Sequence, residues 1–146
     1  MKLIVTKFGG TSVGTVDRIK SVSKRIKNEV NNGYNVIVVV SAMAGETNRL
    51  IKLVESLTNN YRTSEYDTVI SSGEQVTSGL LAIALNELGI KSKSYQGWQI
   101  PFETDNNFSK ANIKEIKKDK ILFDLNDGYV IVVPGFQGVH KNRVTT

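Results

Sequence analysis

The residues with the clearest chemical potential stand near the start of the chain, where Lys7 is followed by Gly9, Gly10, Thr11 and Ser12. Glycines at the carboxyl end of a strand let the backbone approach a ligand closely, and a helix that follows offers unpaired N–H groups and a positive dipole end. A lysine adds a full positive charge. The pattern predicts an anion site, with the two hydroxyl residues either capping the next helix or contacting the anion.

The order of these residues differs from the common nucleotide-binding fingerprints. In the phosphate loop G-x-x-x-x-G-K-[ST] the lysine follows the glycines, whereas Lys7 precedes them, and the spacing G-x-G-x-x-G is also absent. Three other stretches of small polar residues adjoin predicted elements: "SAMAGETN" at 41–48, "SSGEQ" at 71–75 and "PGFQG" at 134–138. Because ligands of open α/β sheets collect outside the carboxyl ends of the strands, we expect these turns to converge on one site.

The spacing of apolar residues predicts the helices and strands that must position these residues. Apolar residues at helical spacing between Val16 and Val30 predict a helix that begins near Val13 and ends at Asn32-Gly33. The next run, "NVIVVVSA", is typical of a strand covered on both faces in a parallel sheet. Together with the strand at 3–5, this order predicts a right-handed βαβ unit.

The remaining elements complete an α/β pattern. We expect a strand-like stretch at 91–98, an irregular or hairpin section at 99–112, and a final apolar strand in "YVIVVPGFQG". The predicted helices cover residues 48–57, 74–88 and 118–126. This succession predicts a three-layer α/β sandwich with a mainly parallel sheet.

Composition narrows the functional classes. The 146 residues, 40% of them hydrophobic, suit one domain. With no cysteine and a single histidine, His140, we expect neither a thiolate metal site nor a zinc site, and we expect a cytoplasmic location. The net charge of +5 comes mostly from scattered lysines, and the lysines between 114 and 120 lack the aromatic and arginine pattern of nucleic-acid modules. We therefore expect neither a nucleic-acid nor a membrane partner.

Four motifs occur in order: "KFGGTSV", "VVVSAMAGETNRLI", "SSGEQVTSGLLA" and "PGFQGV" with the later "RVTT". They resemble the amino-terminal half of the catalytic domain of the aspartokinases, within the amino-acid kinase family, and only residues 99–126 lack a match. The resemblance implies a truncated fold of the carbamate kinase type. It also implies ATP-dependent phosphorylation of L-aspartate to 4-phospho-L-aspartate, at the head of lysine, threonine and methionine biosynthesis.

The resemblance also implies roles for individual residues. The residues expected to hold the ATP phosphates are Lys7, Phe8, Gly9 and Gly10, with Lys7 also catalytic. Ser41 is expected near the nucleotide and the transferred phosphoryl group, and Thr47 and Glu74 are expected to bind aspartate. The residue types suit these roles, because phosphoryl transfer depends on positioning and charge neutralisation. Glu74 suits the amino group of aspartate, since the attacking carboxylate is already deprotonated near pH 7 and needs no general base.

Each assignment has a structural alternative. Lys7 could be a surface lysine, Thr47 a helix cap, and Glu74 a first-turn residue favoured by the helix dipole. Members of the family continue into a G-R-G-G-S-D segment, a nucleotide-binding half and regulatory domains. We therefore expect residues 1–146 to form the phosphoryl-acceptor half, with Mg²⁺ ligands supplied mainly from elsewhere. The chain alone is then inactive or dependent on a complementary chain, or it is a non-catalytic remnant that binds aspartate or phosphate.

Overall fold

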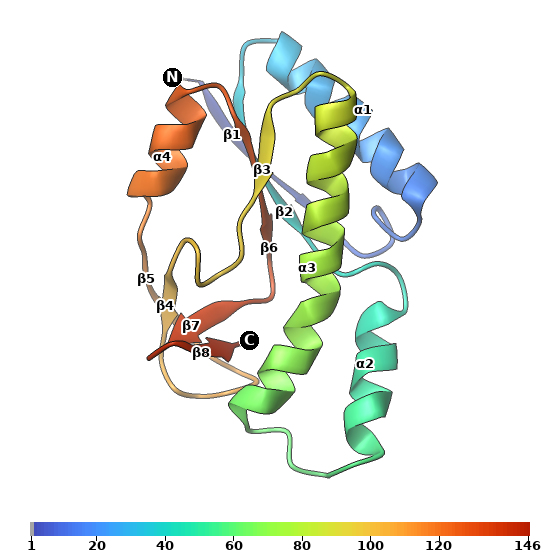
Figure 1. The fold of residues 1–146 in the computed structure, drawn as a ribbon, viewed down its shortest axis with the longest axis vertical. Helices are drawn as coiled ribbons and strands as arrows, with labels where there is room; N and C mark the ends of the chain where they lie inside the picture. The colour runs from blue at the N-terminus through green and yellow to red at the C-terminus, as the bar shows by residue number, and fades with distance from the viewer. Residues whose placement is uncertain (1) are drawn as a thin grey trace.

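The computed structural model describes residues 2–146 and is built around a four-stranded parallel sheet (Figure 1). The strands are β1 (Leu3–Phe8), β2 (Asn35–Val40), β3 (Ser92–Ser94) and β6 (Val130–Pro134). They lie in the order β1-β2-β6-β3. Phe8 is level with Val40, and Val40 is level with Pro134, so β1, β2 and β6 end at the same edge of the sheet. The prediction that these three strands lie side by side is confirmed.

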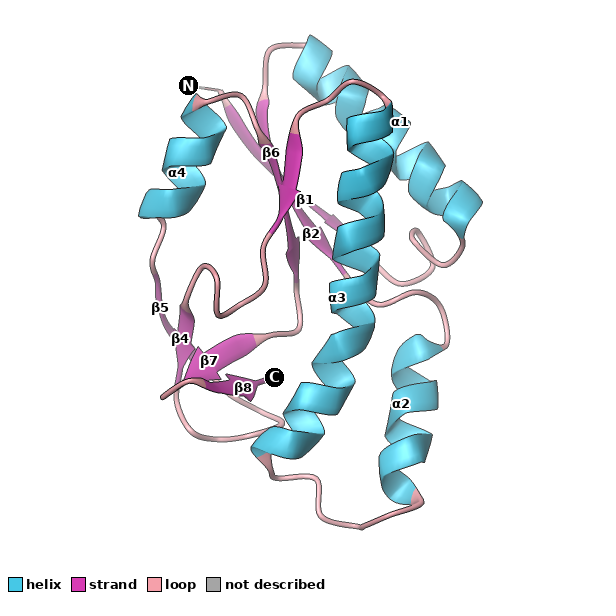
Figure 2. Cartoon of the chain, viewed as in Figure 1, coloured by secondary structure: helices cyan, strands magenta, loops and turns pink. Residues whose placement is uncertain are grey.

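Helices cover both faces of this sheet (Figure 2). α1 (Val16–Asn31) and α3 (Ser64–Glu87) lie on one face and α4 (Asp119–Asn126) on the other, whereas α2 (Glu46–Glu55) packs against α3. Apolar residues of α1 and α3 pack with Val36, Val38 and Val40 on one face, whereas α4 packs with Ile131 and Val133 on the other. The three-layer α/β fold with a mainly parallel sheet is therefore confirmed.

The core lies on both sides of β6, and all five residues of this strand are buried. Its side chains alternate between the two layers, because Val130 and Val132 join the cluster beneath α1 and α3, whereas Ile131 and Val133 join the cluster beneath α4. Each such side chain contributes roughly 1.5–3 kcal/mol relative to leaving it exposed. Because both faces of β6 are buried, its sequence is an unbroken run of apolar residues.

A second, smaller sheet lies beside the amino-terminal half of α3 (Figure 1). Its strands are β4 (Phe102–Thr104), β5 (Ile113–Ile116), β7 (Gly138–His140) and β8 (Arg143–Thr145), in the order β5-β4-β7-β8. β4 pairs with β5 and β7 with β8 in antiparallel fashion, while β4 and β7 are parallel. Only the irregular or hairpin section around β4 corresponds to a sequence prediction, and this sheet was not predicted as such.

The start of α3 corrects one prediction. The helix begins at Ser64, ten residues before the predicted start, and its N-cap Thr63 accepts a hydrogen bond from the Tyr66 amide at 3.1 Å. The stretch 71–75 is therefore the middle of a helix and not a turn. Its small residues serve close packing, since a Cβ added to Gly73 would lie 3.1 Å from the Cβ of Ala42.

The predicted start of α1 is also wrong by three residues. The helix begins at Val16, and its N-cap is Thr15, whose side chain accepts from the Arg18 amide at 3.2 Å. Thr11 and Ser12 do not cap it, because residues 9–14 form turns in which the Gly9 carbonyl accepts from the Ser12 amide at 2.9 Å. The predicted ends hold, since Gly33 and Gly89 follow α1 and α3 with φ of 85° and 76°.

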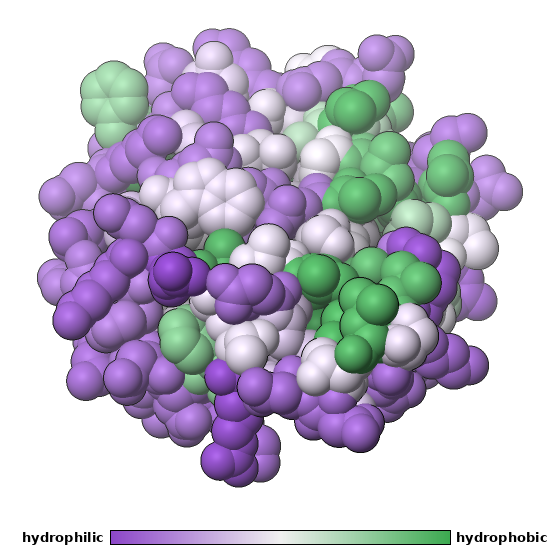
Figure 3. All heavy atoms as spheres, turned by 60° about the horizontal axis from the view of Figure 1, so that its bottom comes forward, coloured by the Kyte–Doolittle hydropathy of each residue, from purple (hydrophilic) through white to green (hydrophobic). Residues whose placement is uncertain are grey.

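The exterior of the lower end of the molecule is mostly hydrophilic, with hydrophobic side chains gathered on one side (Figure 3). Leu53 in α2 and Leu57, two residues after its end, are both exposed, at 51% and 87%. In the described part of the chain, no helix is both long and apolar enough to span a bilayer.

Candidate functional site

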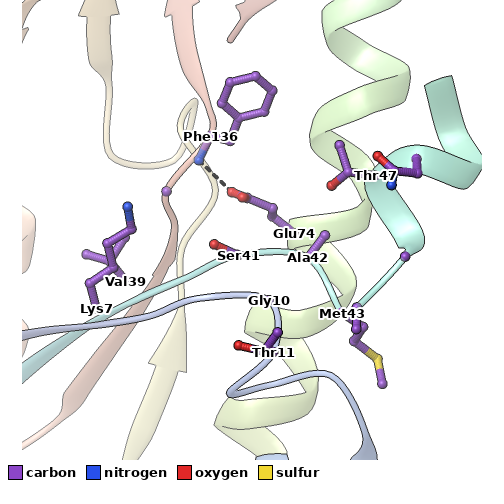
Figure 4. Close-up of a pocket in the computed structure, with 14 residues that line it drawn as sticks. Lys7, Gly10, Thr11, Val39, Ser41, Ala42, Met43, Thr47, Glu74 and Phe136 are labelled. Atoms are coloured by element: carbon purple, nitrogen blue, oxygen red, sulfur yellow. Dashed lines mark hydrogen bonds between the residues drawn. The ribbon is translucent and has the colours of Figure 1, made fainter.

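A pocket of about 750 Å³ opens at the edge where β1, β2 and β6 end. It is lined by residues from all four stretches singled out in the sequence, among them Lys7, Gly10, Ser41, Thr47 and Glu74 (Figure 4). The expected convergence of these stretches is therefore present in the structure. Five of the seven predicted site residues line the pocket.

Phe8 and Gly9 do not line this pocket. The side chain of Phe8 belongs to the hydrophobic core at 9% exposure, and the Arg25 guanidinium lies 5.7 Å from the centre of its ring. Gly9 instead closes the turn that follows β1, because its carbonyl accepts from the amides of Ser12 and Val13. The buried Phe8 ring and the turn at Gly9 thus shape the loop after β1.

Two glycines bring the loops around the pocket into close contact. A Cβ added to Gly10 would lie 3.0 Å from the carbonyl oxygen of Ala42, and one added to Gly135 would lie 3.0 Å from Cγ1 of Val39. Larger residues at either position would push the ends of neighbouring strands apart. The glycines therefore allow the loops that follow β1 and β6 to pack closely against β2 and the loop after it.

Glu74 is the most unusual group in the pocket. It lies in the middle of α3, is only 7% exposed, and its Oε2 accepts a hydrogen bond from the Phe136 amide at 2.5 Å. Burial raises the pKa of Glu74 from 4.5 to about 7, and the rise is limited by hydrogen bonds from the amides of Phe136, Gly135 and Ala42 and by the charge of Lys7. At neutral pH the carboxyl group is therefore about half ionised. A ligand cation beside it would favour the ionised form.

Lys7 and Thr47 flank Glu74 from opposite sides of the pocket (Figure 4). Lys7 is the charged group that acts on the Glu74 carboxyl, and it extends from the end of β1 without an ion pair among the described residues. Thr47 lies in the first turn of α2, whose N-cap position is occupied by Gly45. The structural alternatives for Thr47 and Glu74, a helix cap and a first-turn residue, are therefore wrong, because Thr47 does not cap α2 and Glu74 is not in a first turn.

The donor set fits phosphate and carboxylate groups better than a metal ion. Backbone amides, one lysine and hydroxyl side chains are donors suited to anion oxygens. Among residues 2–146, no cluster of three or more histidine, cysteine, aspartate or glutamate residues could hold a metal. The pocket thus offers donors suited to anion oxygens.

Asp67, a buried acidic residue, was missed by the sequence reasoning. Asp67 is fully buried on α3 and accepts hydrogen bonds from the amides of Ser109 and Thr146 and from the hydroxyl of Thr146. It lies seven residues before Glu74, which places both carboxyls on one face of the helix. The seven-residue spacing is visible in the sequence, but it indicates a shared helix face only if the helix begins at Ser64, which was not predicted.

The fold and the pocket define a class of protein: an α/β protein with a parallel sheet and a pocket of anion-suited donors at the strand ends, without a phosphate loop. The family model described as "Amino acid kinase family" matches residues 2–145, and the chain belongs to this family. The resemblance inferred from the four motifs is thereby confirmed.

Individual relatives carry aspartokinase names. The chain is 51% identical over 150 residues to the aspartokinase of Rickettsia felis, and 47% identical over 146 residues to the aspartate kinase of Pseudomonas putida. These matches cover all of this chain but 37% and 36% of those proteins. The chain therefore spans little more than a third of the curated relatives it matches.

Solved structures agree on the fold. The aspartate kinase from Synechocystis superposes with a TM-score of 0.80 at 37% identity, over 100% of this chain and 24% of that one. Carbamate kinase from Giardia lamblia bound to AMP-PNP superposes with a TM-score of 0.69 at 8% identity, over 99% of this chain and 61% of that one. This second likeness shows the fold alone and confirms the predicted carbamate kinase type.

Proposed function

We propose that the chain carries the amino-acid-binding part of an aspartate kinase, which transfers the γ-phosphoryl group of ATP to the side-chain carboxylate of L-aspartate. The product is 4-phospho-L-aspartate, the first intermediate toward lysine, threonine and methionine. The observation that carries the proposal is the pocket in which Lys7, Glu74 and the strand-end amides converge, in a chain 51% identical to an aspartokinase.

Each group has a role that its chemistry supports. Ionised Glu74 binds the α-ammonium group, and Thr47 donates its hydroxyl to a substrate carboxylate. Lys7, Gly10 and Ser41 bind the phosphates. A side-chain carboxylate oxygen of aspartate then attacks the γ-phosphorus, the bond from that phosphorus to the ADP oxygen breaks, and Lys7 stabilises the charge on the transferred group. No general base is needed, because the attacking carboxylate is already ionised.

Mg²⁺ assists phosphoryl transfer by neutralising phosphate charge. We infer that its ligands come mainly from outside residues 2–146, because these residues contain no suitable acidic cluster. On this basis we expect slow turnover by the 146-residue chain alone. Dependence on a complementary chain and a cytoplasmic location remain predictions. A protein that binds aspartate or phosphate without catalysis is the second candidate, and it is favoured by the lack of an acidic metal-binding cluster among residues 2–146.

Calorimetric titration with L-aspartate tests the proposal. Binding to the ionised form of a carboxyl with a pKa of about 7 weakens roughly 30-fold between pH 8 and pH 5.5, following the ionised fraction. In Glu74→Gln this pH dependence disappears and binding is weak throughout. Glu55→Gln, at the exposed end of α2, serves as the control and keeps the pH dependence.

Two outcomes separate the candidates. No binding of L-aspartate at pH 8 would contradict both the kinase and the aspartate-binding proposals. Binding with no ATP-dependent formation of aspartyl hydroxamate favours the binding protein, whereas hydroxamate formation that requires both ATP and aspartate supports the kinase.

A further inference from the structure

Asp67 lies outside the pocket, and its carboxylate accepts hydrogen bonds from both Ser109 and Thr146. It is fully buried, and both of its carboxylate oxygens lie 3.0 Å from the Ser109 amide. The Thr146 amide donates to it at 3.0 Å and the Thr146 hydroxyl at 2.7 Å. Burial of a carboxylate destabilises the folded protein unless hydrogen-bond donors satisfy its oxygens. Here the donors come from two segments far away in the sequence.

Asp67 and Glu74 attach α3 to the small sheet at two points. They are seven residues apart, or about two turns, and therefore share a helix face. Glu74 holds the amide of Phe136, just before β7, and Asp67 holds Thr146, just after β8. The two attached ends are neighbours in space, because Gly138 pairs directly with Thr145 across the β7–β8 hairpin. Helix, loop and hairpin thus form a closed ring of contacts.

The hairpin within this ring is tightly packed. A Cβ added to Gly138 would lie 2.4 Å from Cγ2 of Thr104. The hydroxyl of Thr104 also lies 2.7 Å from that of Thr145, and both residues are buried. Close-packed groups of this kind transmit a displacement instead of absorbing it. A shift of Thr146 away from α3 therefore moves the segment that carries Phe136.

We propose that Asp67 is a positioning residue, which fixes the end of β8 to α3 and thereby holds the Phe136 amide on the Glu74 carboxylate. The consequence for aspartate binding rests on the proposed function. The effects on the Phe136 amide and on the Glu74 carboxyl do not rest on the proposed function, so they can be measured separately from aspartate binding.

The test uses Asp67→Asn in the 146-residue chain. Asparagine keeps the shape but turns an NH₂ group toward the donors of Ser109 and Thr146, which releases the end of β8. Without ligand, we expect hydrogen exchange of the Phe136 amide to accelerate about tenfold relative to amides of α1. The Glu74 carboxyl, followed by ¹³C NMR, then titrates about half a pH unit higher, because the ionised form has lost a donor. Lys7, the charged side chain that faces Glu74 from β1, is unchanged in the variant.

The ligand-binding measurement is calorimetry with L-aspartate, for which we expect affinity to fall about fivefold. Asp105→Asn is the matched control. This carboxylate accepts from the amides of Asn107 at 3.1 Å and Asn112 at 3.2 Å within its own loop, and none of its hydrogen bonds reaches α3 in the described residues. It should leave Phe136, Glu74 and aspartate affinity unchanged.

The proposal is overturned if Asp67→Asn leaves both the exchange of Phe136 and the titration of Glu74 the same as Asp105→Asn does. If both change in Asp67→Asn while the unaltered chain binds no aspartate, positioning by Asp67 is supported and the proposed function is wrong. If Asp67→Asn does not fold, Thr146→Val replaces it. That variant removes only the 2.7 Å hydroxyl contact, and the same two measurements decide the outcome with smaller shifts.

Discussion

Replacing Glu74 by glutamine should stabilise the protein above neutral pH. The folded-state pKa of Glu74 is about 7, against 4.5 for an ordinary glutamate, so the folded protein holds this proton more tightly than the unfolded chain does. Below pH 4.5 both states are protonated and the group costs nothing. Between pH 4.5 and 7 the unfolded chain ionises while the buried carboxyl stays protonated, so stability falls, and the loss is complete once the pH has risen through the folded-state pKa of about 7. Glutamine never ionises and avoids this loss.

The size of the effect follows from the pKa difference. At about 1.4 kcal/mol per pKa unit, ionised Glu74 lowers the free energy of unfolding by about 3 kcal/mol at pH 8 and by less than about 1 kcal/mol at pH 5. Glu74→Gln should therefore exceed the unaltered protein by about 2–3 kcal/mol at pH 8 and by less than about 1 kcal/mol at pH 5. The glutamine oxygen still accepts from Phe136, while its NH₂ group opposes the amides of Ala42 and Gly135 and reduces the gain.

Urea unfolding followed by circular dichroism measures this directly, at pH 5 and at pH 8. The informative quantity is the change with pH in the stability difference between variant and unaltered protein, because every other titrating group is common to both. Glu55→Gln, at the exposed end of α2, controls for the loss of one negative charge. An equal stability difference at the two pH values would refute the assignment of a raised pKa to buried Glu74.

Three further substitutions test the site and its frame. Lys7→Met should abolish calorimetric binding of triphosphate and change stability by no more than about 0.5 kcal/mol, since the side chain is exposed; a much lower melting temperature with unchanged binding would make Lys7 structural. Gly138→Ala should lower the free energy of urea unfolding by at least about 2 kcal/mol, because its Cβ would lie 2.4 Å from Thr104 Cγ2. Gly79→Ala, in open space within α3, should raise it by about 0.5–1 kcal/mol, and a loss would show that packing around α3 is tighter than the structure indicates.

The strand ends around the site could be predicted because long buried strands have a clear sequence signature. β2 and β6 are runs of β-branched residues, and a parallel sheet covered on both faces needs little else. Once these strands were placed beside β1, the position of Lys7 and of the stretch 41–48 at one edge followed from parallel pairing. The convergence of loops was therefore predictable before any side-chain contact was known.

The first half of α3 could not be predicted from local pattern. The stretch 71–75 has the small polar residues of a turn, but tertiary contacts decide its structure, because Gly73 packs against Ala42 and Leu50. The burial of Glu74, and with it the raised pKa, depends on this placement in mid-helix. No feature of the sequence distinguishes it from a glutamate in a first turn.

The small sheet was missed for a different reason. Its strands have three or four residues each, and all four residues of β5 are exposed, so neither length nor alternation marks them as strands. The turn between β7 and β8 places Lys141 and Asn142 at positive φ, of 46° and 64°, where glycine is the usual signal. Short strands and an atypical turn together conceal the hairpin.

The position of β6 has a consequence for how the protein folds during synthesis. β6 is the last strand of the main sheet to leave the ribosome, yet it lies between β2 and β3. Ile37 must find Ile131, more than ninety residues later, and such distant pairing is slow. Until then the β-branched edge of β2 has no partner and can pair with another chain. Pairing of β6 with β2 therefore competes with the association of incompletely folded chains.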